Sequence, residues 1–248
     1  MASYSLRKNS TVPLDIIPLK RRDLEARGIY KRAFDPKQST EFTYLRFFVP
    51  YLNNYKGWAL FADDDFLWLG DVKELIDQAD DKYAVMCVKH DYNPEVSHKL
   101  ANLLQEPYPR KNWSSMMLLN CGHPANRALT LQSANDKPGS FLHRFSWIMD
   151  DSLIGAVHFE WNFLVKHHTP RDGALPKAIH YTEGGPWFPD YRDTDYAAEW
   201  LEMMREYEST LSEVRMLCPY ERFSTRNLPA LDGYPNSHIA WNYIQDIS

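Results

Sequence analysis

The sequence predicts an α/β fold, a single domain in which a mostly parallel sheet is covered by helices on both faces. Four short apolar runs have the pattern of buried strands: WALFA (Trp58–Ala62), YAVMCV (Tyr83–Val88), SSMMLLN (Ser114–Asn120) and KAIHY (Lys177–Tyr181). Between these runs lie segments in which apolar residues recur at helical spacing. Strands that alternate with helices are typical of a largely parallel sheet covered on both faces. The sequence shows no internal repeat and no linker that would divide the chain.

The region before the first of these runs is expected to hold one more strand, a loop and a helix. VPLDIIPL (Val12–Leu19) has the composition of a short strand and is bracketed by prolines. The polar stretch that follows it is expected to form a loop. From Phe42 onward apolar residues recur at helical spacing, and Pro50 should kink or end that helix.

Helices are expected after several of the strands. VKELIDQA follows Asp71 and has an amphipathic pattern, with Asp71 as its cap, and SHKLANLLQ (Ser97–Gln105) is also expected to be helical. The segment Asp193–Leu211 begins with acidic residues, which the helix macrodipole favours at an N-terminus. We assign residues 1–210 to the α/β domain and residues 211–248 to a C-terminal extension.

Composition and charge exclude several classes of protein. The chain has 248 residues, of which 44% are hydrophobic and 25% charged, so it can bury a sizeable core without disulfides. A net charge of −5 argues against a general nucleic-acid binder. Three cysteines without a CxxC pair suit a reducing cytoplasm and provide no zinc-site spacing. The start of the chain lacks the apolar segment of a signal peptide, and no run approaches the length of a membrane span.

Three consecutive carboxylates, Asp63, Asp64 and Asp65, follow the apolar run WALFA. In open α/β sheets, ligands bind beyond the carboxyl ends of the strands. Alternation of side chains places Asp63 and Asp65 on one side and Asp64 on the other. Two converging carboxylates suit Mg²⁺ or Mn²⁺, and such an ion would relieve the repulsion between the acids. The alternative is a solvated turn that caps the following helix.

A second candidate feature is IHYTEGGPWF (Ile179–Phe188), which joins the end of a strand to a glycine turn. His180 lies at the strand end, where it could meet Asp63 and Asp65 around one ion. A hydrogen-bonded core histidine is the alternative. Glycines permit close approach of a ligand to the backbone, as phosphates and sugars require. Because histidine binds a metal only as the neutral imidazole, metal affinity should fall at acid pH.

A set of motifs occurs in one order along the chain: FTYLRFFVPYL, ALFADDDFLWLGDV, NWSSMMLLN, MDDSLIG with the pair Trp161-Asn162, and HYTEGGPWF. In this order they resemble the retaining glycosyltransferases of family 8, which include glycogenin and bacterial galactosyl- and glucosyltransferases. The resemblance extends over roughly Ser39–Glu206. It implies a GT-A fold, a nucleotide-sugar donor that is usually UDP-linked, and Mn²⁺ (or Mg²⁺) as the metal.

The resemblance also implies a role for each matching residue. Asp63 and Asp65 match the family's DxD metal ligands, and His180 matches its histidine ligand. Arg46 matches a basic residue near the donor. Residues that would surround the transferred sugar or contact the donor are Asn112, Trp113, Ser114, Ser115, Gly184 and Gly185. The acids that would line the sugar and acceptor side, and could stabilise an oxocarbenium-like state, are Asp150 and Asp151. Trp161 and Asn162 match a motif with a structural role.

The chain departs from the family pattern at three places. The segment SYSLRKNS has the pattern of the end of the family's first helix, so the opening strand is expected to be absent and the fold shortened at its N-terminus. Gly185 stands where the family usually has a lysine before Pro-Trp. Asp151 stands where the family has glutamine, which adds negative charge near the sugar.

The sequence therefore predicts a metal-dependent retaining glycosyltransferase that acts on a nucleotide-sugar, with an unidentified acceptor. One alternative is a degenerate, non-catalytic relative that binds a glycan or a protein. A weaker alternative is a metal-dependent phosphohydrolase that uses the acidic cluster. Acceptor specificity is expected to lie in loops such as KHDYNPEVSHK, in which His90 and Asp91 are candidates, although a solvated turn is the alternative.

Overall fold

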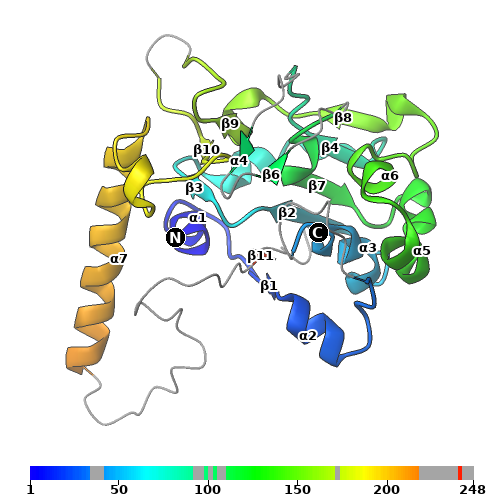
Figure 1. The fold of residues 1–248 in the computed structure, drawn as a ribbon, viewed down its shortest axis with the longest axis horizontal. Helices are drawn as coiled ribbons and strands as arrows, with labels where there is room; N and C mark the ends of the chain where they lie inside the picture. The colour runs from blue at the N-terminus through cyan, green and yellow to red at the C-terminus, as the bar shows by residue number, and fades with distance from the viewer. Residues whose placement is uncertain are drawn as a thin grey trace.

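A computed structural model describes residues 1–33, 42–91, 98–99, 103–104, 110–170, 174–217 and 240–241 of the chain. Two sheets form the centre of one α/β domain, and helices lie on both faces (Figure 1). The predicted α/β class and the covering of both faces are confirmed. Residues 92–97 of the predicted acceptor loop lie outside the described residues, as does Cys218.

The larger sheet has the strand order β2-β7-β4-β8. Its strands are β2 (Trp58–Ala62), β4 (Val85–Cys87), β7 (Met116–Asn120) and β8 (Ile154–Ala156). Strand β7 runs antiparallel to both of its neighbours, whereas β4 and β8 are parallel. The sheet is therefore mixed, and the prediction of a mostly parallel sheet is wrong. Strand β7 is buried on both faces, so its sequence is continuously apolar although the strand is antiparallel. The hydrophobic pattern therefore does not distinguish a parallel from an antiparallel strand here.

The smaller sheet has the order β3-β10-β9, with β3 (Phe66–Trp68), β9 (Phe163–Leu164) and β10 (Ala178–His180). Strand β10 is antiparallel to β3 and parallel to β9. Residues 63–65 connect β2 of the larger sheet directly to β3 of the smaller one. The predicted acidic cluster therefore lies at the junction of the two sheets.

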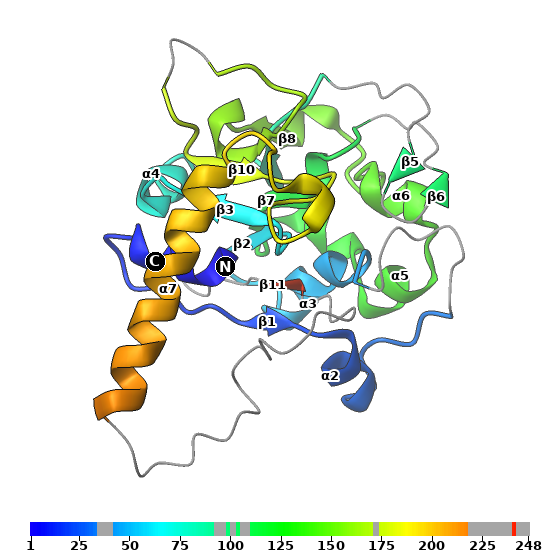
Figure 2. The same cartoon turned by 60° about the vertical axis from the view of Figure 1, so that its left-hand side comes forward.

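Helices cover the sheets on both sides. The α-helices are α1 (Ala2–Lys8), α2 (Arg21–Ala26), α3 (Val49–Leu52), α4 (Val72–Ile76), α5 (Leu131–Asp136), α6 (Gly139–His143) and α7 (Ala197–Leu217). The 3-10 helices are η1 (Leu45–Phe48), η3 (Trp113–Ser115), η4 (Pro124–Ala128), η5 (Asp151–Leu153), η6 (Phe159–Asn162) and η7 (Pro189–Tyr191). Figure 2 shows α7 running along one side of the molecule, beside the N-terminus.

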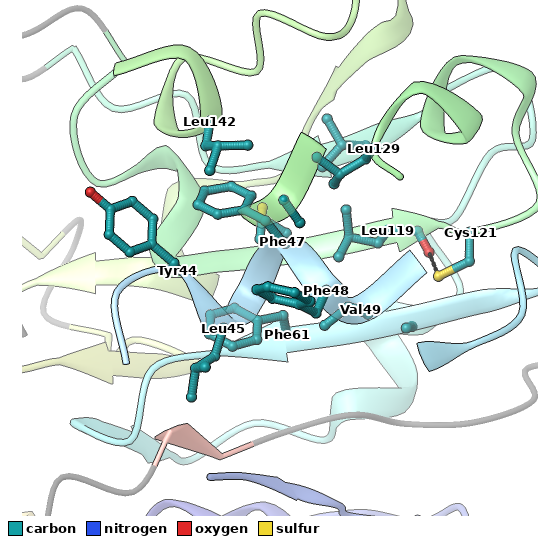
Figure 3. Packing of buried hydrophobic residues seen from close by; sticks show 14 of the residues in the cluster. Tyr44, Leu45, Phe47, Phe48, Val49, Phe61, Leu119, Cys121, Leu129 and Leu142 are labelled. Carbon is teal, nitrogen blue, oxygen red and sulfur yellow. Dashed lines mark hydrogen bonds between the residues drawn. The ribbon is translucent and has the colours of Figure 1, made fainter. Parts of the chain in front are cut away.

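Alternate side chains of the larger sheet enter two separate core clusters. Phe61 and Leu119 pack with η1, α3, α5 and α6 on one face (Figure 3). Leu60 and Leu118 pack with α1 and α4 on the other face. The smaller sheet packs against α7 in a third cluster that includes Trp200 and Met203 of that helix. Burial of each large apolar side chain contributes about 1.5–3 kcal/mol, so these clusters fix the positions of the strand ends.

Several predicted elements differ from the structure. The polar stretch after the first strand contains α2, which is stabilised by an Arg21–Glu25 ion pair and buries Leu24. Pro50 lies in the first turn of α3, where its missing N–H is tolerated, and so it does not end a helix. The segment predicted as a helix at Ser97–Gln105 contains the short antiparallel strands β5 (His98–Lys99) and β6 (Leu103–Leu104).

The predicted cap of the helix that follows Asp71 is confirmed. Asp71 caps α4, and its Oδ1 accepts a hydrogen bond of 3.0 Å from Lys73 N. Strand β1 is limited to Pro18–Leu19 and pairs antiparallel with β11 (Ala240–Trp241). The proposed boundary between residues 210 and 211 falls inside α7, which continues to Leu217. Within the described ranges, no helix is both long enough and apolar enough to cross a bilayer.

Asn126 is a fully buried polar residue beside the larger sheet. Its side chain makes hydrogen bonds to three separate segments of the chain. Its Nδ2 donates to Ala84 O and to Asn120 O, both at 2.7 Å, and its Oδ1 accepts from Trp147 Nε1 at 3.0 Å. Asn126→Ala leaves these groups without their partner, so we expect the free energy of unfolding to fall by about 3 kcal/mol in urea denaturation. The exposed helix variant Gln132→Ala is the control and should change stability by less than about 0.5 kcal/mol. Equal stability of the two variants would contradict this role for Asn126.

Candidate metal centre

Asp63, Asp65 and His180 come together at the junction of the two sheets. Each residue offers one ligand atom, and these atoms all lie within 4.8 Å of one another. His180 is the last residue of β10 and pairs in register with Phe66, the residue that follows Asp65. His180 Nε2 lies 3.2 Å from Asp65 Oδ1. His180 is far from Asp65 in the sequence. The antiparallel pairing of β3 with β10 brings the two residues side by side.

The acidic turn is held to the backbone of both sheets. Asp63 N donates to Ser115 O at 2.9 Å, which continues the pairing of β2 with β7. Tyr181 N donates to Asp65 O at 3.0 Å, which continues the pairing of β10 with β3. The two carboxylates that face His180 are therefore placed by main-chain hydrogen bonds at either end of the turn.

Asn162 sets the tautomer of His180. Asn162 Nδ2 donates to Ser115 Oγ at 2.9 Å, so its Oδ1 is the acceptor for His180 Nδ1–H, also at 2.9 Å. A neutral His180 therefore carries its proton on Nδ1, and the lone pair of its Nε2 then faces Asp65. The ring also stacks on Phe66, with 4.5 Å between centroids. In metal sites the ligand nitrogen of a histidine is free, and its other ring nitrogen donates a hydrogen bond. The contacts of His180 have this arrangement.

Sequence reasoning assigned no chemical role to Asn162, although it orients a candidate ligand. Its side chain is completely buried in an otherwise apolar stretch, Trp161–Val165. A buried amide inside an apolar stretch must be hydrogen-bonded, and this requirement could have singled it out. Ser115 completes the arrangement, because its Oγ donates to Asn112 O at 2.7 Å and accepts from Asn162.

Arg46 lies behind Asp63 and is buried. Its Nη2 donates to Asp63 Oδ1 at 2.6 Å, its Nη1 to Ser114 O at 2.7 Å and its Nε to Thr43 O at 3.1 Å. The guanidinium also lies over the ring of Phe61, 4.9 Å from its centroid. The predicted basic residue is thus in the site, where it fixes the orientation of the Asp63 carboxylate.

Asp64 is not among the grouped ligand atoms of the described residues. Burial, followed by the charges of Asp65 and Asp63, raises the pKa of the Asp64 carboxyl well above its usual range. The separation of Asp64 from its two neighbours agrees with the alternation that the sequence predicted.

The residues predicted around the sugar directly precede β7, and Ser115 O is bonded to the first residue of the acidic turn. Trp113 donates from Nε1 to His90 O at 3.0 Å, and its ring lies near two cations, Arg110 at 5.5 Å and Lys89 at 5.9 Å. Ser114 Oγ lies 2.8 Å from His143 Nδ1. Asn112 has a left-handed backbone, φ 62°, which turns the chain into η3. The hydroxyls of Ser114 and Ser115 are engaged within the protein, so these residues shape the wall of the site.

The glycine turn follows β10 directly. Gly184 has φ +133°, a conformation that favours glycine. A Cβ on Gly185 would lie 2.1 Å from the ring of Trp187. Trp187 therefore packs onto the turn at Gly185 and leaves no room there for a side chain. A Cβ on Gly184 would instead meet the ring of Tyr191 at 3.1 Å.

Asp150 and Asp151 are exposed and are not among the grouped ligand atoms of the described residues. Asp150 Oδ1 accepts from Ser152 N at 2.9 Å, which caps η5. Asp151 Oδ2 accepts from Arg110 Nη2 at 2.5 Å. Their assignment to the sugar and acceptor side stays a prediction.

The buried pair of Arg46 and Asp63 generates a prediction about stability. Arg46→Leu would leave a mostly buried carboxylate without its cation, so we expect the free energy of unfolding to fall by about 3–5 kcal/mol in urea denaturation. Asp63→Asn in the same variant should recover part of this loss, because it removes the uncompensated charge. The control is Lys73→Ala, which breaks an exposed pair with Asp77 and should cost less than about 1 kcal/mol. A loss in Arg46→Leu no larger than in the control would show that Arg46 does not compensate the Asp63 charge.

Several solved glycosyltransferase structures are similar to this chain over most of its length. The apo form of the glycosyltransferase GlyE from Streptococcus pneumoniae TIGR4 has a TM-score of 0.49 and 17% identity, over 84% of this chain and 59% of that one. The apo bifunctional glycosyltransferase WbbM has a TM-score of 0.48 and 18% identity, over 71% of this chain and 36% of that one. The galactosyltransferase LgtC, solved with donor and acceptor sugar analogues, has a TM-score of 0.43 and 12% identity, over 73% and 71%. The chain thus spans between about a third and three fifths of the WbbM and GlyE chains.

No protein-family model matches the sequence. Protein CDI of Arabidopsis thaliana is 49% identical over 207 residues, which cover 82% of this chain and 80% of the plant protein. About half of the aligned positions therefore agree along most of both chains. The protein belongs to the same family as Protein CDI.

Proposed function

We propose that the protein is a metal-dependent retaining glycosyltransferase that moves a sugar from a UDP-sugar to an acceptor yet to be identified. The observation that carries this proposal is the convergence of Asp63, Asp65 and His180, with the lone pair of His180 Nε2 facing the carboxylates. The ordered motif set that resembles family 8 glycosyltransferases supports the choice of reaction.

The donor set fits a divalent cation. Two carboxylates and one neutral imidazole suit Mn²⁺ well, while Mg²⁺ prefers oxygen ligands alone. When bound, such a cation would supply positive charge that stabilises the leaving diphosphate. Asp63, Asp65 and His180 would hold the cation, and Arg46 and Asn162 would keep Asp63 and His180 oriented.

Other parts of the site have supporting roles in this proposal. Trp113 and the cations beside it lie on the same sheet edge and could contact the donor. Asp150 and Asp151 are the acids that we propose for the sugar and acceptor side, on the resemblance alone. No residue of the described chain is assigned as a nucleophile.

The first test of the metal site compares adjacent aspartates. We expect wild-type protein to bind Mn²⁺ in calorimetric titration, and Asp65→Ala to abolish binding because it removes one of the three ligands. Asp64→Ala is the matched control and should bind Mn²⁺ as tightly as wild type, since Asp64 lies outside the group. Equal loss of binding in both variants would refute the assignment of Asp63 and Asp65 as the ligand pair.

The second test concerns the donor. Incubation of the full chain with Mn²⁺ and a panel of UDP-sugars should release UDP slowly from one of them, because retaining transferases hydrolyse donors without an acceptor at a low rate. We expect this activity to disappear in Asp65→Ala and on removal of the metal with EDTA.

Two outcomes would point elsewhere. Absence of binding to every UDP-sugar in calorimetry would favour the non-catalytic alternative, a relative that binds a glycan or a protein. Hydrolysis of simple phosphate esters without dependence on a sugar would favour a phosphohydrolase.

A further inference from the structure

His90 lies at the same sheet edge as the acidic turn. The register pairs Ala62 with Met116 and Met86 with Leu118, so the carboxyl ends of β2 and β4 lie beside the start of β7. His90 follows β4 by three residues, and its carbonyl accepts the hydrogen bond from Trp113 Nε1. The side chain is buried, with 6% exposure.

A chain of hydrogen bonds sets the tautomer of His90. Leu164 N donates to His168 Nδ1 at 3.1 Å, so a neutral His168 carries its proton on Nε2. His168 Nε2 lies 3.4 Å from His90 Nδ1 and is the donor of that contact. His90 Nδ1 is therefore an acceptor, and the His90 proton lies on Nε2.

Both histidines are held in the neutral form. Burial, and then the neighbouring His168, His180 and His167, lower the pKa of His90 to about 3. Burial, His167 and His180 lower the pKa of His168 as well. At neutral pH this pair is uncharged, which is unsuited to holding a phosphate. The pair does not suit a metal either, because His168 Nε2 is protonated and a ligand nitrogen needs its lone pair.

His90 Nε2–H is a buried donor with no acceptor among the described residues. Such a group costs about 1–3 kcal/mol when it stays unsatisfied, so it calls for an explanation. The protein orients this N–H through two further residues and supplies no oxygen for it within the described ranges. An oxygen that arrives with a ligand would satisfy it.

We propose that His90 Nε2–H donates a hydrogen bond to a hydroxyl of the sugar of the UDP-sugar donor, with His168 as the positioning residue that holds the tautomer. The inference rests on the proposed function, because a diphosphate held at Asp63, Asp65 and His180 places its attached sugar beside this edge. His90 Nε2–H is an uncharged donor in a buried position, so its partner should be an uncharged hydroxyl. Such a contact would stabilise the bound sugar and not the diphosphate.

Two isosteric variants separate this role from packing. In His90→Gln, the amide N–H lies near the position of Nε2 and can replace the donor. In His90→Asn, the amide reaches only the position of Nδ1, so contact with His168 is kept and the donor is lost. Calorimetry with Mn²⁺ measures the binding of UDP, UDP-glucose and UDP-galactose to the full chain.

We expect His90→Asn to weaken binding of the preferred UDP-sugar about tenfold while UDP binds as to wild type, and His90→Gln to stay within about threefold of wild type. Equal weakening for UDP and the UDP-sugar would show a structural role and overturn the inference, as would an unchanged UDP-sugar affinity in His90→Asn. If wild type binds neither UDP nor either UDP-sugar, the proposed function fails first and the inference fails with it.

The tautomer is tested separately, on wild-type protein. In ¹⁵N NMR of the histidine side chains, His90 should show a protonated Nε2 and an unprotonated Nδ1 at neutral pH. His168→Phe, which removes the partner of Nδ1, should release His90 into a mixture of tautomers. A proton on Nδ1 of His90 in the wild-type chain would overturn the inference, whatever the binding data show.

Discussion

The site depends on one constraint, the attachment of a three-residue acidic turn to two different sheets. Asp63 N is bonded to Ser115 O of the chain leading into β7, and Asp65 O is bonded to Tyr181 N beyond β10. Buried clusters pack against both sheets, and one cluster contains residues of each, so neither end of the turn can move without disturbing that packing. Like charges are thereby held close together, an arrangement that costs free energy and that Arg46 compensates only at Asp63.

Two histidines at this edge have opposite tautomers. Asn162 accepts from Nδ1–H of His180, which leaves an Nε2 lone pair beside the carboxylates. His168 donates to Nδ1 of His90, which leaves an Nε2–H as a donor. The same side chain is thus prepared as a metal ligand in one place and as a hydrogen-bond donor in the other. The difference comes from the group that contacts each Nδ1, an acceptor on Asn162 and a donor on His168, which is why the imidazole alone does not define its chemistry.

Part of the fold follows from patterns that can be read along the chain. Strands β2, β7 and β10 coincide with apolar runs, and Asp71 caps the amphipathic helix α4. The patterns fail where the deciding contact is remote or weakly patterned. The direction of β7 depends on its partners in the sheet, and α2 buries a single leucine and therefore has almost no apolar periodicity.

The sequence by itself determined which residues could hold a metal, because the spacing Asp63-x-Asp65 beyond a buried strand already places two carboxylates on one side. It also determined the α/β class and the glycine turn after His180. Only the tertiary structure decided that His180 faces those carboxylates through Nε2, and that Asn162, Arg46 and His168 orient the functional groups. These contacts join segments from 17 to 78 residues apart, and hydrogen bonds at such separation depend on how the sheets pack, which no local pattern encodes.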